Sequence, residues 1–163
     1  SQDALNLLKQ DHARVKSLFG RFEKARGKEQ KAKLAATMCS ELNVHAQLEE
    51  QVFYPAVRQV IEEEELLDEA QVEHASVKAL VAQIESTSPE DRLFDAKVKV
   101  LGEYVNHHVK EEEGEMFREI RCTDLDLGAL GERMKRRKQE LQSRQSAGTM
   151  RRQPSGDAAG AVP

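Results

Sequence analysis

Four stretches of the chain carry apolar residues at intervals of three and four, the spacing that places them on one face of an α-helix. These stretches are residues 5–22, 38–60, 67–84 and 94–120. Turn or charge signals follow the first three of them, at Gly27, at the acidic run 62–65 and at residues 86–89. Because β-branched and aromatic residues do not gather into alternating runs, the pattern predicts an all-α protein.

Four long helices joined by short connections are typical of an antiparallel bundle with up-down-up-down topology. In this interpretation residues 1–122 form the four-helix bundle. A weaker apolar stripe at Leu127, Leu130, Met134 and Leu141 predicts an additional C-terminal helix, over residues 123–143, that packs on the bundle. Residues 144–163 consist mainly of Ser, Gly, Ala, Gln, Arg and Pro, and we expect them to form a flexible, disordered tail.

The chain contains an internal repeat. Residues 11–18 match residues 73–80, and residues 45–50 match residues 108–113, at offsets of 62 and 63 positions. The first two helices therefore correspond to the last two, and the bundle should have a pseudo-twofold axis. The positions that repeat best are histidines and glutamates.

Each of the four apolar stripes is interrupted by one histidine: His12, His45, His74 and His108. Glu49 and Glu112 follow the second and fourth of these by four residues, so each pair shares a helix face. Six inward-pointing polar groups would destabilise an apolar core unless they bind one another or an ion. The set predicts a buried metal site.

A single His–Glu pair of this spacing is more often a surface ion pair, and a single core histidine is usually just hydrogen-bonded. The complete set, repeated in both halves, favours metal binding. Structural zinc prefers four ligands, often thiolates, and calcium or magnesium prefers oxygen alone. Mixed imidazole and carboxylate donors favour a pair of iron ions, with manganese as the lesser alternative.

The sequence resembles the hemerythrin-like family, the HHE cation-binding domain, over about residues 3–141. The matching motifs are His12 after Asp11, His45 and Glu49 leading into Phe53-Tyr54-Pro55, His74 after Glu73, and His108 with Glu112. This resemblance implies a centre of two iron ions (Fe²⁺/Fe³⁺) with a bridging oxo or hydroxo group. It also implies that the four histidines are terminal ligands and that Glu49 and Glu112 are bridging ligands.

One departure from the family concerns the number of histidines. Oxygen-carrying hemerythrins use five, whereas this chain has Lys78 one turn after His74, where a second histidine would stand. The candidate ligands for the coordination positions that remain on the two irons are Glu50, Glu113, Tyr104, His107 and water. More open positions favour reactivity over reversible oxygen carriage.

Charge and composition restrict the partners. The chain has 25 basic and 29 acidic residues and a net charge of -4, which argues against a nucleic-acid-binding module. No apolar run approaches the ~20 residues of a membrane span. Cys39 and Cys122 lack the spacing of a metal or redox motif and are interpreted as reduced thiols of a cytoplasmic protein. The expected partner is a small diatomic or peroxide ligand, and the expected assembly is a monomer or weak homo-oligomer.

The sequence thus predicts a non-haem diiron protein that binds or reacts with dioxygen, peroxide or nitric oxide, in redox sensing or detoxification. Catalase-like, peroxidase-like or oxygen-reducing activity is compatible with this interpretation, which leaves open both the physiological ligand and whether the site is catalytic. The alternatives are iron storage or sensing without catalysis, and a metal-independent helical interaction module.

Overall fold

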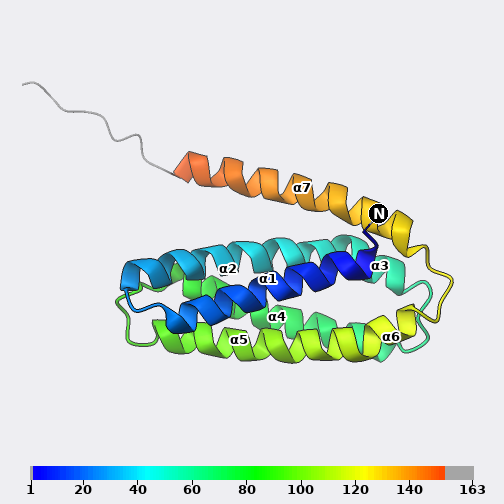
Figure 1. Ribbon diagram of the computed structural model, residues 1–163, viewed down its shortest axis with the longest axis horizontal. Helices are drawn as coiled ribbons and strands as arrows, with labels where there is room; N and C mark the ends of the chain where they lie inside the picture. The colour runs from blue at the N-terminus through cyan, green and yellow to red at the C-terminus, as the bar shows by residue number, and fades with distance from the viewer. Residues whose placement is uncertain (1, 153–163) are drawn as a thin grey trace, which may run out of the picture.

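The computed structural model describes residues 2–152, which form helices and the turns that join them. The four longest bundle helices are α1 (Ala4–Lys24), α2 (Lys28–Leu48), α4 (Glu64–Ser86) and α5 (Phe94–Glu111), and they run antiparallel in up-down-up-down order (Figure 1). The predicted all-α bundle is confirmed. Within the described residues, no helix combines the length and the apolar character of a membrane crossing.

The second and fourth helical stretches each contain one π-helical turn. The first, η1 (Glu49–Phe53), joins α2 to α3 (Tyr54–Val57), and the second, η2 (Glu112–Met116), joins α5 to α6 (Phe117–Ile120). A π turn places an extra residue in the helix and is frequent at functional sites. The two π turns begin at Glu49 and Glu112, the glutamates of the predicted metal site. The internal repeat of the sequence is therefore also a repeat of this backbone feature.

Buried polar residues divide the core into two apolar clusters. One cluster, around Leu8, Phe53 and Phe117, lies where α3, α6 and α7 meet the bundle. The other, around Phe22 and Leu101, lies toward the opposite end of the bundle. Between them are the seven buried polar or charged residues of the described chain: Asp11, His12, His45, Glu49, His74, His108 and Glu112.

The C-terminal helix α7 (Leu127–Arg152) packs against α1 and α2, as predicted, but it is longer than expected (Figure 1). The predicted boundary at residue 143 is too early, because the polar residues that follow are compatible with helix and Gln145 hydrogen-bonds Ser40 of α2. The rest of the predicted tail, residues 153–163, lies outside the described residues. Gly131 permits close packing near the chain start, where an added Cβ would lie 2.6 Å from the backbone oxygen of Gln2.

Candidate metal centre

The four predicted histidines meet in two pairs at the middle of the bundle. The Nε2 atoms of His12 and His45 are 3.1 Å apart, and those of His74 and His108 are 3.2 Å apart. One member of each pair comes from the first half of a helical hairpin and the other from its second half. The pairs are therefore related by the internal repeat.

Glu49 lies between the two pairs and is fully buried. Its Oε1 atom is 3.0 Å from Nε2 of His45, and its Oε2 atom is 3.0 Å from Nε2 of His74. Glu112 is also buried, and its Oε2 atom is 2.9 Å from Nε2 of His108. The structure thus brings together all six residues selected from the sequence, and Glu49 joins the two histidine pairs through its two oxygens.

Each imidazole binds a carboxylate through its outer nitrogen. Nδ1 of His12 lies 2.7 Å from Glu113 and Nδ1 of His74 lies 3.1 Å from Glu50. In the same way Nδ1 of His108 lies 2.7 Å from Glu73, and Nδ1 of His45 lies 3.4 Å from Asp11. Such carboxylates fix the tautomer and orientation of metal-binding histidines, because Nδ1–H donates to them and Nε2 is directed inward.

Tyr54 is the residue of this centre that the ligand prediction omitted. Its hydroxyl donates to Oε2 of Glu112 at 2.9 Å and lies 3.2 Å from Nε2 of His74. It also lies 3.3 Å from Glu49 and 3.4 Å from His108. The signal for it in the sequence is the motif Phe53-Tyr54-Pro55, whose tyrosine comes five residues after Glu49.

The donor set fits metal ions better than it fits a set of hydrogen bonds. Two neighbouring nitrogen ligands about 2.1 Å from one ion lie about 3 Å apart, which matches both Nε2–Nε2 distances. Among the described residues, Oε1 of Glu49 and Oε1 of Glu112 are the buried side-chain atoms that accept no hydrogen bond, although Oε1 of Glu49 lies 3.0 Å from Nε2 of His45. Buried carboxylate oxygens need such a partner or a cation. The side chains therefore fit a metal-ion site, and His12, His45 and Glu49, or Glu49, His74 and His108, are groups that could hold an ion.

Charge within this centre raises the pKa of two imidazoles. Burial opposes the charged form of His45, but the carboxylates of Glu49 and Asp11 outweigh it and raise the pKa to about 10. For His108, burial is likewise outweighed by Glu112, Glu49 and Glu73, and the pKa is about 9. Burial and the nearby Glu112 raise the pKa of Tyr54 well above its usual value. The carboxylates of the centre thus favour positive charge on His45 and His108.

The residues considered for the remaining metal positions have different roles. Glu50 and Glu113 bind the outer nitrogens of His74 and His12, and Lys78 contacts Glu50 at 2.8 Å. Tyr104 is 48% exposed and His107 forms a surface ion pair with Glu111 at 3.2 Å. Tyr104 and His107 therefore lie outside the buried centre.

Four antiparallel helices that direct imidazole and carboxylate groups to one buried centre define a helical cation-binding domain. The chain belongs to the hemerythrin HHE cation-binding domain family, whose profile matches residues 3–120. This match confirms the resemblance inferred from the sequence motifs.

The comparison with solved structures also supports this fold. The crystal structure of a hemerythrin HHE cation-binding domain-containing protein from Mycobacterium kansasii superimposes with a TM-score of 0.79. The two are 24% identical, and the alignment covers 98% of this chain and 97% of that chain.

A protein of Nostoc sp. (strain PCC 7120) named DNA nickase is 31% identical over 119 residues. The alignment includes 71% of this chain and 33% of the relative. The chain thus spans about a third of that protein's length.

Proposed function

We propose that this chain is a non-haem diiron protein that binds or reacts with dioxygen, peroxide or nitric oxide. The observation that carries the proposal is the position of Glu49, whose two oxygens each lie 3.0 Å from a nitrogen of a different histidine pair. A carboxylate in that position suits two adjacent metal ions. Nitrogen and oxygen donors without a thiolate favour iron, with manganese as the lesser alternative.

Bound iron would supply electrons and open coordination positions for a small ligand. His12 and His45 would hold one ion, His74 and His108 the other, and Glu49 would bind both. Glu112 would bind the second ion through Oε2, and its unpaired Oε1 is available to the first. The Tyr54 hydroxyl, which donates to Glu112 and lies 3.2 Å from Nε2 of His74, would bind the second ion as a phenolate once the metal displaces its proton.

The two metal positions differ in their aromatic neighbours. Tyr54 puts a hydroxyl beside the His74–His108 pair, whereas Phe117 stacks on His12 with ring centroids 6.3 Å apart. Phe117 has no group that can bind metal, so the His12–His45 position has fewer protein donors. This asymmetry supports entry of the small ligand on the His12 side.

Iron sensing without catalysis is the second candidate function. The four histidines come from four different helices, so loss of metal would weaken contacts throughout the bundle. A metal-independent scaffold is less favoured, because the apolar core is interrupted by two buried carboxylate oxygens without a hydrogen-bond partner. DNA nicking is not favoured for this chain, because its net charge of -4 does not suit nucleic-acid binding and the alignment covers a third of that relative.

The test is to reconstitute the full chain with ferrous iron under anaerobic conditions and then admit each small molecule separately. Reversible spectral change on adding and removing dioxygen indicates carriage, and sustained consumption of hydrogen peroxide indicates turnover. A stable nitric oxide spectrum without turnover of either of the other two favours sensing. An iron-loaded protein that responds to none of the three would contradict the proposed function.

A further inference from the structure

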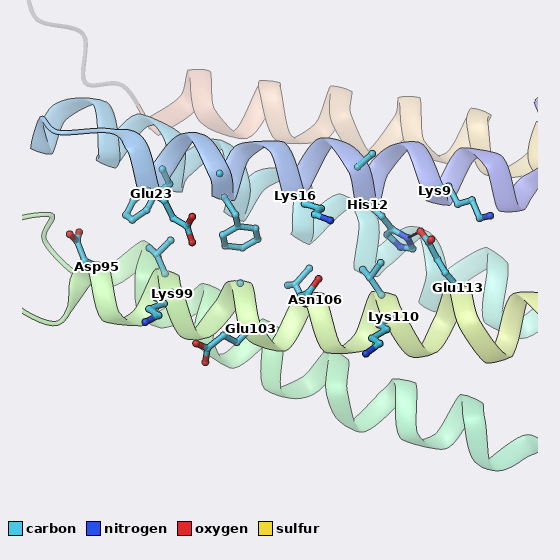
Figure 2. Close-up of a pocket in the computed structure, with 18 of the residues that line it drawn as sticks. Lys9, His12, Lys16, Glu23, Asp95, Lys99, Glu103, Asn106, Lys110 and Glu113 are labelled. Atoms are coloured by element: carbon cyan, nitrogen blue, oxygen red, sulfur yellow. Dashed lines mark hydrogen bonds and ion pairs between the residues drawn. The ribbon is translucent and has the colours of Figure 1, made fainter.

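A groove of about 970 Å³ runs between α1 and α5 (Figure 2). His12 and Glu113 line one end, and Phe22, Lys31 and Asp95 line the other. Phe19 and Val98 contribute apolar surface between these ends, and the ring of Phe19 lies against Gly102, where an added Cβ would be 3.1 Å away. Its volume and apolar lining are those of a small-molecule site.

The internal repeat relates this groove to the interface between α2 and α4. Between α2 and α4, Asn43 donates to Glu85 across the helices at 3.1 Å. The corresponding residues in the groove, at offsets of 63 and 62, are Asn106 and Glu23. Both lie between α1 and α5 in Figure 2, and they make no hydrogen bond to one another. The groove therefore lacks the cross-helix hydrogen bond that its counterpart between α2 and α4 has.

A lysine of the groove shows the same difference between the halves. Lys78 forms an ion pair with Glu50 at 2.8 Å. Its counterpart Lys16 lies between α1 and α5 (Figure 2) and forms no ion pair with a described residue, and neither does Lys9. Two ammonium groups of the groove are thus available to an external anion.

The charges of the groove have a direction. Lys9 and Lys16 flank His12 on α1, one turn to either side, and Glu113 at this end contacts His12 at 2.7 Å. At the opposite end Lys31 pairs with Asp95, and Glu23 is the carboxylate that forms no ion pair with a described residue. Lys99, Glu103 and Lys110 point away from α1. An anionic group is attracted to the His12 end and repelled from the Glu23 end, and the apolar lining lies between them.

We propose that this groove binds an elongated amphipathic carboxylate, with its head group between Lys9 and Lys16 and its acyl chain along Phe19 toward Phe22. His12 and Phe22 are ten positions apart on α1, or about 15 Å along the helix, which suits a medium-chain fatty acid. His12 lies between the two lysines, but the lysines and the apolar side chains that would hold the ligand are not among the proposed metal ligands.

The first experiment is calorimetric titration of the full chain with dodecanoate, in the wild type and two matched variants. Gly20→Leu places a side chain in the groove, where an added Cβ meets nothing within 4 Å, and leucine also favours helix. Ala82→Leu makes a similar change at the corresponding exposed position of α4, outside the groove. We expect one dodecanoate per wild-type chain, about tenfold or greater loss of affinity in Gly20→Leu, and none in Ala82→Leu.

The second experiment tests the head-group assignment. Lys16→Gln should weaken dodecanoate binding about fivefold and reduce its dependence on salt, whereas Lys24→Gln on the same helix should change neither. Dodecyltrimethylammonium, with the same chain and opposite charge, should bind at least about tenfold more weakly than dodecanoate. Equal binding of the two amphiphiles would overturn the proposal, as would unchanged affinity in correctly folded Gly20→Leu.

Absence of dodecanoate binding up to its solubility limit would also overturn it. Sedimentation analysis tests whether a second copy of the chain, rather than a fatty acid, occupies the groove. A concentration-dependent dimer that Gly20→Leu abolishes and Ala82→Leu preserves would assign the groove to a second copy of the chain instead.

Discussion

Tyr54 and Phe117 occupy corresponding positions in the two halves of the bundle, 63 residues apart, and differ by one hydroxyl group. Each follows a π turn that begins at a glutamate of the candidate centre. The Tyr54 hydroxyl lies within 3.4 Å of atoms of four members of that centre. The Phe117 ring instead stacks on His12 at an interplanar angle of 15°. The hydroxyl is the main chemical difference between the two proposed metal positions.

Tyr54→Phe should remove this difference while leaving the histidine and glutamate donors in place. We expect the variant to retain its iron but to lose the visible charge-transfer absorption that a phenolate bound to ferric iron produces. Absorption spectra with iron determination on the same samples provide the measurement. An unchanged visible spectrum at full iron content would mean that Tyr54 does not bind the metal.

Metal binding should release protons. With pKa values of about 10 and about 9, His45 and His108 are protonated at pH 7 in the metal-free protein, and both must lose a proton to bind metal through Nε2. Calorimetry of ferrous iron binding at pH 7, in buffers with different ionisation enthalpies, measures this release. A binding enthalpy that is the same in all buffers would contradict it.

The same pKa shifts fix the sign of a stability change. Because the pKa of each imidazole is raised from 6.5, its contribution to the stability of the metal-free protein is complete below about pH 6.5. It decreases above that pH and is lost as the pH passes the folded-state values of about 9 and about 10. The melting temperature of the metal-free protein should therefore fall from pH 7 to pH 10. A flat profile would contradict the protonated state.

The outer carboxylates should control metal affinity without binding metal. Glu113→Gln weakens the support of His12, and Glu50→Gln that of His74, because each removes the charged acceptor at Nδ1. Loss of such a partner lowers metal affinity about 10- to 100-fold. Competition with a chelator measures this loss, and Glu115→Gln, an exposed change in the same π turn as Glu113, serves as the control. Equal affinities in all three variants would contradict the role of the outer carboxylates.

The bundle and most of the centre follow from sequence periodicity, because a histidine at a core position of each stripe must point inward. The position of Tyr54 does not follow, since five residues of regular α-helix would put it about 140° from Glu49 around the helix axis. The π turn η1 adds a residue to that turn and brings Tyr54 back to the face of Glu49. The contact of Lys138 with Asp11 does not follow from the sequence either, because it depends on how α7 packs on α1. The periodicity of apolar residues within one helix does not determine that packing.

The docking of α7 has its own test. Gly131→Ala would place a Cβ within 3 Å of the backbone at the chain start, which must shift, at a cost of about 1–3 kcal/mol. Gly148→Ala meets nothing within 4 Å and should be neutral or stabilising by up to about 1 kcal/mol. Chemical denaturation of the two variants gives both free energies. Similar free energies of unfolding would contradict the close packing of α7 at Gly131.

Iron content per chain after anaerobic reconstitution tests the central claim most directly, and two adjacent histidines make a matched pair of variants. His108 is buried among the proposed ligands, whereas His107 lies on the surface. The account predicts about two irons in the wild type and in His107→Ala, and about one or fewer in His108→Ala. Less than one iron in the wild type, or an undiminished iron content in His108→Ala, would contradict the diiron centre.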